Sequence, residues 1–359
     1  MYEYDENINS QWRLEEFVNS KFLASVFLVV SIHGFAQASI AEGEKGADSD
    51  DRAVLDEQLS RDFGLGDLSS PGGKLYERVC ASCHEKGIDR APQRAMLLLM
   101  SPESIYRAMT KGVMRPQAAT LSDDEKIAVS EFLARMKVGD LSANEPPNCS
   151  GKSNDFDFYE PPVFSGWGLS PEGAHEISAA TAGLNKENIK RLKVKWAFAY
   201  PGALRARSQP ALAGGAIYVG SHGGTVYAFD RETGCVRWFY EASAEVRTGI
   251  VVSPWAAGDK SATPMIFFGD LIGNQYALDA MTGEMVWKQR PDEAPTATLT
   301  GTPTLHEGIL YVPVSSLEVV PAAESDYECC HFRGSVVAYE AKTGTQKWKA
   351  FTIPDVPVK

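Results

Sequence analysis

Residues 226–238 read VYAFDRETGCVRW, and the pattern of this stretch decides the fold class of the second half of the chain. The pattern returns twice, as QYALDAMTGEMVW at residues 275–287 and as VAYEAKTGTQKW at residues 337–348. All copies share the core A-x-[DE]-x-x-T-G-x-x-x-W, and a short apolar run precedes each of them. Two apolar segments separated by turn residues predict antiparallel strands. Their closing tryptophans recur after 49 and 61 residues, and an insertion near residues 317–332 accounts for the longer spacing. This recurrence predicts a repeat architecture.

Each copy carries the residues that a tight turn between two strands needs. Asp230 and Asp279 can accept hydrogen bonds from backbone amides within the turn. A glycine follows the threonine and supplies the positive φ that such turns often require, at Gly234, Gly283 and Gly344. The closing tryptophan is large and apolar, so we expect its ring to pack between successive sheets while its N–H finds a carbonyl. Repeated four-stranded sheets of this length predict the blades of a β-propeller.

Residues 80–84 in the first half read CASCH, a C-x-x-C-H motif. Two thiols at this spacing can add to the vinyl groups of a haem while the adjacent imidazole of His84 reaches the iron. A zinc knuckle would need a second ligand pair nearby, and none follows in the sequence. A dithiol redox site has no need of the adjacent histidine. The motif therefore predicts a haem c that is attached through Cys80 and Cys83 and ligated by His84.

The iron also needs a sixth ligand, for which four methionines are candidates: Met96, Met100, Met109 and Met114. The first two lie in a leucine-rich run that is typical of a core, and Met109 lies inside a helical pattern. Met114 follows the end of that pattern, where a thioether in a loop can fold over the haem face. We therefore predict Met114 as the ligand. We also expect the carbonyl of Pro92 to accept a hydrogen bond from the second nitrogen of the histidine ring.

Composition divides the chain into segments. Residues 39–65 are polar and acidic, and residues 139–165 are rich in Pro, Asn, Asp and Ser without periodicity, so the latter are typical of a linker. The haem segment holds three helical patterns, and the last opens with a capping box from Ser122 to Glu125. The predicted organisation is a signal region at 1–38, a spacer at 39–65, a cytochrome c domain at 66–138, a linker at 139–165 and a partial β-propeller of about three blades at 166–359.

The apolar run at residues 22–35 is too short to span a bilayer, which needs about 20 residues. Ala36-Gln37-Ala38 follows it, a small-x-small pattern of signal-peptide cleavage. We expect export to a periplasm of the Gram-negative type, where disulfides persist, and no membrane span after the signal is removed. The alternative for the apolar run at residues 22–35 is a buried core helix. Residues 1–17 are acidic where a signal peptide should be basic, so we expect the true start to lie downstream, near Val18.

Acidic residues outnumber basic residues, 47 to 35, and the net charge is −12 without any basic cluster. Phosphate binding needs concentrated Lys and Arg, so we expect no nucleic acid partner. Hydrophobic residues make up 44% of the chain and charged residues 23%, which is typical of a globular protein with a sizeable core.

Residues 66–138 resemble class I cytochromes c through the C-x-x-C-H motif, the later Gly-x-Met and the terminal helix. The second half resembles the pyrroloquinoline quinone (PQQ) dehydrogenases, whose propeller blades carry this tryptophan-docking repeat. The fusion of an N-terminal cytochrome to such a propeller resembles the polyvinyl-alcohol dehydrogenase group of quinohaemoproteins. The resemblance implies an α plus all-β multidomain fold, PQQ and Ca²⁺ beside haem c, and an alcohol substrate such as polyvinyl alcohol. It also implies a cytochrome or oxidase chain as the downstream electron acceptor.

The resemblance assigns roles to residues of the second half. Arg247 matches an arginine that contacts a PQQ carboxylate, and a bidentate bond suits that pair. Thr300 opens a Thr-Gly-x-Pro strand that lies against the cofactor in the family. Ser315 is assigned to PQQ, and Glu318 matches a glutamate that binds calcium, since hard Ca²⁺ prefers carboxylates. Taken singly, Arg247 has the alternative of a rim salt bridge and Glu318 that of a solvated loop charge.

The four remaining cysteines form two candidate pairs. Cys329 and Cys330 are adjacent, and PQQ dehydrogenases often hold a disulfide between neighbouring cysteines against the cofactor. In the methanol-oxidising members that pair precedes the arginine, whereas here it follows Glu318. We include both cysteines among the PQQ contacts, while free thiols or two separate disulfides stay open. Cys149 and Cys235 are left over and can join the linker to the first blade.

The stretch from Trp196 to Lys359 holds fewer than four repeats, and the resembling enzymes continue for several more blades. We therefore expect the chain to be truncated and inactive alone, with its catalytic base and further calcium ligands beyond residue 359. The alternative is a non-enzymatic cytochrome c whose propeller serves as a docking scaffold. Arg247, Thr300 and Glu318 favour the dehydrogenase.

Overall fold

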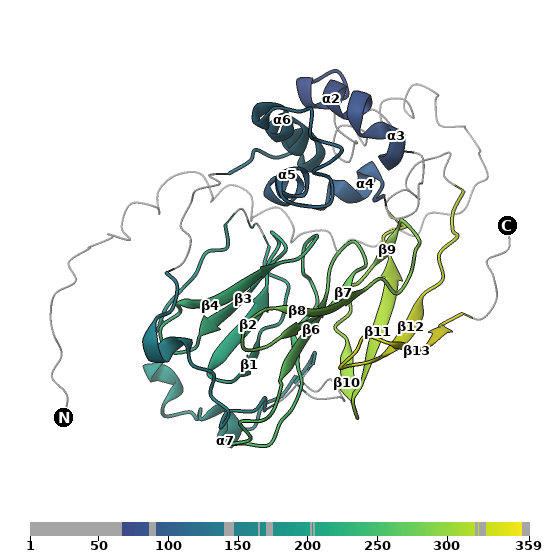
Figure 1. Cartoon of the computed structure of the whole chain (residues 1–359). Coiled ribbons are helices and arrows are strands. Elements are labelled where there is room, and N and C mark those ends of the chain that lie inside the picture. The colour runs from purple at the N-terminus through teal and green to yellow at the C-terminus, as the bar shows by residue number, and fades with distance from the viewer. Residues whose placement is uncertain are drawn as a thin grey trace, which may run out of the picture. The chain divides into compact units, whose positions relative to one another are not determined.

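The structure is a computed structural model, shown in Figure 1. It describes residues 67–85, 91–139, 147–163, 166–169, 175–201, 203, 205–319, 322 and 328–353. The predicted signal region and spacer, residues 1–65, lie outside the described residues. None of the helices formed by the described residues is long and apolar enough to cross a membrane.

The haem motif lies in a helical domain. Its helices are α2 (Pro71–Val79), α3 (Ala81–His84), α4 (Arg94–Leu97), α5 (Pro102–Thr110) and α6 (Asp123–Ala134). The predicted capping box at the start of α6 is present: Ser122 Oγ accepts from the backbone N–H of Glu125 at 3.2 Å, and the Glu125 carboxylate accepts from the backbone N–H of Ser122 at 2.8 Å. Helices α2 and α6 pack together at Gly72, where an added Cβ would lie 2.2 Å from the carbonyl oxygen of Ala128. This glycine lets the two backbones approach closely.

The described residues of the second half form three antiparallel sheets, as the repeat predicts. Sheet 1 has the order β1 (Ala211–Ala213), β2 (Ala216–Gly220), β3 (Thr225–Asp230) and β4 (Val236–Glu241). Sheet 2 has the order β5 (Val251–Val252), β6 (Met265–Gly269), β7 (Gln275–Asp279) and β8 (Met285–Gln289). Sheet 3 has the order β10 (Thr304–His306), β11 (Ile309–Ser316), β12 (Ser335–Glu340) and β13 (Gln346–Phe351), with β9 (Ala297–Thr298) also paired to β11. The remaining short helices are η1 (Gly151–Asn154), α7 (Ala179–Ala182) and η2 (Ile189–Arg191).

The inner strands of the sheets are covered on both faces. Every residue of β3 and of β6 is buried, whereas β13 at the outer edge of sheet 3 is largely exposed. One apolar core lies between sheets 1 and 2 and includes Tyr218 and Phe268, and another lies between sheets 2 and 3 and includes Phe267 and Val312. Strands that are buried on both faces are rich in apolar residues without alternation, which explains the continuous runs in the sequence.

The tryptophan of each repeat joins its sheet to the next one. Trp238 Nε1 donates to the carbonyl of Ala280 at 3.1 Å, and Trp287 Nε1 donates to the carbonyl of Ala341 at 2.8 Å. Each ring also lies against a turn glycine of the following sheet, Gly283 for Trp238 and Gly344 for Trp287. The predicted contact of ring and N–H with the neighbouring sheet is therefore present at both joints.

The turn chemistry of the repeat is also present. Asp230 Oδ1 accepts from the backbone N–H of Thr233, and Asp279 Oδ1 accepts from that of Thr282, both at 2.9 Å. Gly234 and its two counterparts have φ between 70° and 74°. Because an L side chain is strained at such angles, glycine suits the turn. Trp196, which precedes the first repeat, takes the same place over Gly234 and donates to the carbonyl of Arg231 at 3.0 Å.

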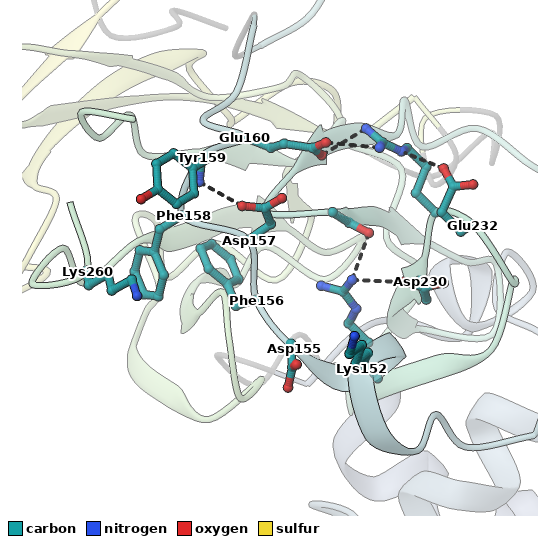
Figure 2. A pocket seen from close by; sticks show the side chains of 13 residues that line it. Lys152, Asp155, Phe156, Asp157, Phe158, Tyr159, Glu160, Asp230, Glu232 and Lys260 are labelled. Atoms are coloured by element: carbon teal, nitrogen blue, oxygen red, sulfur yellow. Dashed lines mark hydrogen bonds and ion pairs between the residues drawn. The ribbon is translucent and has the colours of Figure 1, made fainter. Parts of the chain in front are cut away.

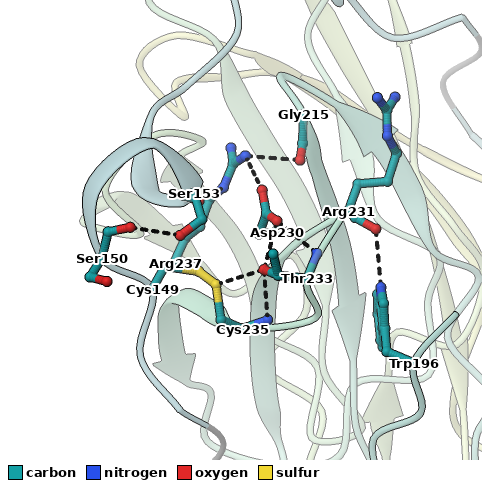
Figure 3. Close-up of a disulfide and its surroundings, with 10 residues drawn as sticks. All are labelled: Cys149, Ser150, Ser153, Trp196, Gly215, Asp230, Arg231, Thr233, Cys235 and Arg237. Atoms are coloured by element: carbon teal, nitrogen blue, oxygen red, sulfur yellow. Dashed lines mark hydrogen bonds and ion pairs between the residues drawn. A yellow bond between two sulfur atoms is a disulfide. The ribbon is translucent and has the colours of Figure 1, made fainter. Parts of the chain in front are cut away.

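The segment predicted as a linker is fixed to sheet 1 where the structure describes it. Cys149 and Cys235 form a disulfide, as the leftover pair predicts (Figure 3). The backbone N–H of Cys149 also donates to the carbonyl of Val236 at 2.9 Å. Arg237 donates to the carbonyl of Ser153 at 2.9 Å and forms an ion pair with Asp230. A segment without periodicity is therefore ordered here by side chains of β4.

Candidate functional site

The haem motif places its three functional side chains on one short turn of helix. His84 ends α3 and is buried, with 9% of its surface exposed. Its Nδ1 lies 2.6 Å from the carbonyl oxygen of Pro92, as predicted, so Nδ1 donates the hydrogen and Nε2 is left to ligate a metal. Cys80 and Cys83 are both free thiols. The donor set therefore fits a covalently attached haem.

The thiol of Cys80 is unsuited to the alternative of a dithiol redox site. Burial, together with the neighbouring Cys83, raises the pKa of this thiol to about 11. A reactive redox cysteine needs the opposite, a pKa low enough to give thiolate near neutral pH.

Three of the four candidate methionines are core residues. Met96, Met100 and Met109 are buried, with at most 6% of their surface exposed, which agrees with the core role predicted for the first two. Met114 lies in the turn after α5, where its backbone N–H donates to the carbonyl of Ala108 at 2.9 Å. Its side chain is partly buried against the helical core. The role of Met114 as iron ligand stays a prediction.

A cluster of charged residues surrounds Arg247, the predicted contact of a PQQ carboxylate. Arg247 Nε donates to the Oε2 of Glu245 at 2.8 Å, and Arg205 Nη2 lies 3.8 Å from the same oxygen. Only 1% of the Glu245 surface is exposed. Burial lowers the pKa of the Arg247 guanidinium, Glu245 opposes this, and the positive charges of Arg207 and Arg205 lower the pKa further. One buried carboxylate therefore pairs with two guanidinium groups, Arg247 and Arg205, and the charge of Arg207 also acts on Arg247.

Two guanidinium nitrogens in this cluster lack a partner. Arg247 Nη2 and Arg205 Nε are buried without a hydrogen bond to any described residue. Leaving such donors unpaired is costly, so native proteins almost always satisfy them. An excess of buried positive charge with a free donor fits an acidic, carboxylate-bearing ligand. The free donor of Arg247 is compatible with a PQQ carboxylate, and the contact itself stays a prediction.

The structure brings the turn of Arg247 next to the strand of Thr300. The backbone N–H of Gly249 donates to Thr302 Oγ1 at 2.7 Å, which links the two segments. Thr300 itself is exposed in the turn after β9. Ser315 lies in β11, where it pairs with Thr298 of β9. The segments that hold Arg247 and Thr300 are therefore linked, and Ser315 pairs with the strand that precedes Thr300.

Glu318 lies beyond β11 and is engaged by the backbone. Its carboxylate accepts from the N–H of His331 at 2.6 Å and from the N–H of Phe332 at 3.0 Å. These amides directly follow Cys329 and Cys330, which form a disulfide with each other and are exposed. The side chain is buried, so the alternative of a solvated loop charge is wrong.

The described residues offer little to a calcium ion. Among them, no group of three or more His, Cys, Asp or Glu side chains lies close enough together to hold a metal ion. Ca²⁺ takes six to eight oxygen ligands, and Glu318 is the one carboxylate that the sequence assigns to it. The described residues alone therefore do not provide enough ligands for a Ca²⁺ ion.

A surface cleft of about 410 Å³ lies where the linker crosses sheet 1 (Figure 2). None of the residues predicted to bind a cofactor lines this cleft. Its charged groups pair with one another, since Arg231 donates to both carboxylate oxygens of Glu160 at 2.8 and 3.0 Å. Arg237 donates to the carbonyl of Gly214 at 2.7 Å. The residues of this cleft therefore hold the linker against sheet 1 and are not part of the candidate site.

Sequence reasoning missed three members of the Arg247 cluster: Arg205, His222 and Glu245. Arg205 Nη2 lies 2.7 Å from Nε2 of His222. Burial lowers the pKa of His222. The negative charge of Glu245 raises this pKa, and the positive charge of Arg205 lowers it. The neutral imidazole can therefore accept the hydrogen bond. The one feature of the sequence that could have indicated this cluster is the position of Glu245, two residues before Arg247.

Two family models match the chain. Residues 188–355 match a family described as outer membrane protein assembly factor BamB. Residues 68–133 match a family described as cytochrome c oxidase, cbb3-type, subunit III. The two matches cover the sheets and the helical domain separately.

Curated relatives match both halves together. A polyvinylalcohol dehydrogenase from a Pseudomonas species is 38% identical over 80% of this chain and 46% of that protein. The polyvinylalcohol dehydrogenase of Sphingopyxis sp. (strain 113P3) is 32% identical over 80% of this chain and 45% of that protein. A solved quinohemoprotein alcohol dehydrogenase from Comamonas testosteroni is 23% identical with a TM-score of 0.42, over 56% of this chain and 28% of that one.

The chain spans about half the length of the two polyvinylalcohol dehydrogenases that it matches. Its match to them is continuous across the cytochrome and propeller segments that the family models recognise separately. The chain is thus a homologue of the polyvinylalcohol dehydrogenases along about 80% of its own length, joining a cytochrome c segment to a segment of a PQQ-type propeller.

Proposed function

We propose that this chain provides the haem c and part of the PQQ site of an alcohol dehydrogenase. The observation that carries the proposal is the buried guanidinium of Arg247, whose Nη2 has no partner among the described residues. It lies beside one buried carboxylate and two further arginines. A small acidic quinone would supply the missing acceptor and balance the charge.

The proposed roles of the chain follow from these contacts. Bound PQQ would accept two electrons from the alcohol, and haem c would pass them on singly. Arg247 holds a carboxylate of the cofactor, while Glu245 fixes the orientation of the guanidinium through the 2.8 Å bond to its Nε. Thr300, Ser315, Cys329 and Cys330 are proposed as further contacts of PQQ.

In the haem domain, Cys80 and Cys83 attach the haem, and the bond from His84 Nδ1 to Pro92 orients the ring for the iron. Met114 is the proposed ligand on the other face. Alcohols, including polyvinyl alcohol, are the proposed substrates, and a cytochrome or oxidase chain is the proposed acceptor. Glu318 stays the single proposed ligand of Ca²⁺ among the described residues.

A periplasmic location is also proposed. The disulfide between Cys149 and Cys235 supports it, because such bonds form and persist in oxidising compartments. Covalent haem attachment through a C-x-x-C-H motif agrees with that location.

The docking scaffold remains a second candidate, favoured by the family described as an outer membrane protein assembly factor. A scaffold of this kind would keep its covalent haem and would show no affinity for PQQ. The two candidates therefore differ in one measurable property.

The test is a titration of the haem-loaded chain with PQQ, followed by quenching of tryptophan fluorescence. We expect Arg247→Ala to weaken binding roughly 10- to 100-fold, since a hydrogen bond to a charged group contributes about 1.5–3 kcal/mol. Arg247→Lys should lie between, because lysine keeps the charge and loses the fork. Arg231→Ala, whose partner is Glu160, is the matched control and should bind as the wild type does. Absence of saturable binding by the wild type, or equal affinity in all variants, would refute the PQQ site.

A further inference from the structure

We propose that Arg205 is a positioning residue that fastens the haem domain to the Arg247 cluster and so sets the path of electrons between the two cofactor sites. The proposal rests on the proposed function, since it takes PQQ to bind at Arg247 and haem at Cys80 and Cys83. Arg205 lies in the segment before β1, and its guanidinium contacts both parts of the molecule.

Two polar contacts join the helical domain to the loops of sheet 1, and the first is made by α5. Ser104 Oγ donates to the carbonyl of Gly223 at 2.8 Å, and Arg107 Nη1 donates to the same carbonyl at 3.1 Å. Arg107 Nε also forms an ion pair with Glu241 at 3.1 Å. This contact holds α5 but touches no member of the Arg247 cluster.

The second contact is made by Arg205. Its Nη2 donates to the carbonyl of Leu99 at 2.9 Å, just before α5, and lies 2.7 Å from His222 Nε2. The His222 ring also forms a hydrogen bond with the backbone of Leu99. Two side chains of the propeller segment therefore converge on one backbone carbonyl of the haem domain.

Apolar residues from both parts surround these polar contacts. Leu97 and Met100, on either side of Leu99, share one buried cluster with Ala244 and Leu271 of the propeller segment. Ala244 directly precedes Glu245, and the backbone N–H of Leu271 donates to the carbonyl of Glu245 at 2.9 Å. Arg205 therefore bridges the two parts beside an apolar contact, with 32% of its own side chain still exposed.

A continuous series of contacts follows from these distances. It runs from the Leu99 carbonyl to Arg205, then to Glu245 at 3.8 Å, and then to Arg247 at 2.8 Å. Electron tunnelling falls steeply with distance, so a rigid contact between the two cofactor-bearing segments favours transfer. Arginine suits this position because its planar group serves several acceptors at once, whereas lysine offers a point charge.

The role requires that Arg205 act on docking and transfer without serving as a ligand of PQQ. Its Nη2 is committed to Leu99 and His222. Its buried Nε has no partner among the described residues, but the free donor that we assign to PQQ is Nη2 of Arg247. The Arg205→Ala variant removes the contacts of Arg205 with Leu99 and Glu245, and Arg205→Lys keeps part of them. Arg231→Ala again serves as the control, since Arg231 pairs with Glu160 in the linker.

The first measurement is hydrogen exchange of the haem-loaded chain, which needs no PQQ. We expect Arg205→Ala to raise amide exchange roughly tenfold or more in residues 97–110 and 221–247, with the haem spectrum unchanged. Arg205→Lys should restore part of the protection, and Arg231→Ala should leave these segments as in the wild type. Unchanged exchange in Arg205→Ala would overturn the docking role.

The second measurement separates electron transfer from chemistry at the quinone. With chemically reduced PQQ supplied to the haem-loaded chain, Arg205→Ala should slow haem reduction at least several-fold while the affinity for PQQ stays as in the wild type. Loss of PQQ affinity together with haem reduction would assign Arg205 to the quinone site and overturn the proposal. If the wild type does not bind PQQ, or its haem is not reduced by the reduced quinone, the proposed function fails and the electron path falls with it, while the exchange result still decides the docking contact.

Discussion

The joint between sheets 1 and 2 allows a sharp test of the repeat. Gly283 has a φ of 74°, and a Cβ added there would lie 2.6 Å from Cε3 of Trp238. That ring cannot easily move aside, because its Nε1 is bonded to the carbonyl of Ala280. Alanine at this position would therefore suffer both a strained backbone, about 1–2 kcal/mol, and overpacking of about 1–3 kcal/mol. We expect Gly283→Ala to lower the free energy of unfolding by about 2–5 kcal/mol.

Gly308 provides the matched control. Its φ is 77°, and no atom lies within 4 Å of a Cβ added there. Gly308→Ala should therefore cost only the backbone strain, about 1–2 kcal/mol. The assay is urea unfolding followed by far-ultraviolet circular dichroism, with the two variants compared under one set of conditions. Equal losses in Gly283→Ala and Gly308→Ala would refute the reasoning that the tryptophan ring needs a glycine beneath it.

Three further predictions concern the haem ligand, a buried histidine and the linker. Met114→Ala should remove the weak absorption band of methionine–iron ligation and Met109→Ala should spare it; the reverse result would reassign the ligand. Burial lowers the pKa of His222, so the unfolded chain binds more protons below about pH 6.5, and stability present above that pH should fall as the solution is acidified. His222→Gln should flatten this fall in unfolding measured from about pH 7.5 to 5.5, and an unaltered profile would contradict it. The disulfide of Cys149 and Cys235 joins residues 86 positions apart, so in the chain-entropy model Cys149→Ser should lower the free energy of unfolding by about 4–5 kcal/mol. No loss of stability would show that the other contacts of the linker are sufficient to fix it.

Features that depend on neighbouring residues could be predicted from the sequence. The turn of Asp230 and Gly234 is local, since the side chain bonds an amide three residues on. The contact of His84 with Pro92 spans eight residues and follows from the geometry that a haem-ligating histidine needs. The capping box of Ser122 is likewise confined to one turn of helix. Such patterns repeat in sequence because the chemistry that produces them is local.

The contacts that assemble the candidate site were beyond the sequence. Arg205 and Leu99 are 106 residues apart, and neither lies in a periodic pattern. Arg237 fixes the linker from a position 84 residues further on. Glu318 could be recognised as a special carboxylate by resemblance, but its bonds to two backbone amides beyond an insertion could not. Loops that meet only in the folded protein leave no regular signature along the chain.

The cysteines of this chain need different oxidation states during maturation. Four of the six form disulfides, whereas Cys80 and Cys83 are free thiols three residues apart. With the export proposed above, the compartment is oxidising, and haem has to reach Cys80 and Cys83 while both are still thiols. The disulfide of Cys149 does not compete with haem, since its partner Cys235 directly precedes β4 and folding of sheet 1 brings the two together. The order of haem attachment and thiol oxidation would then set what fraction of the chain can carry the proposed haem.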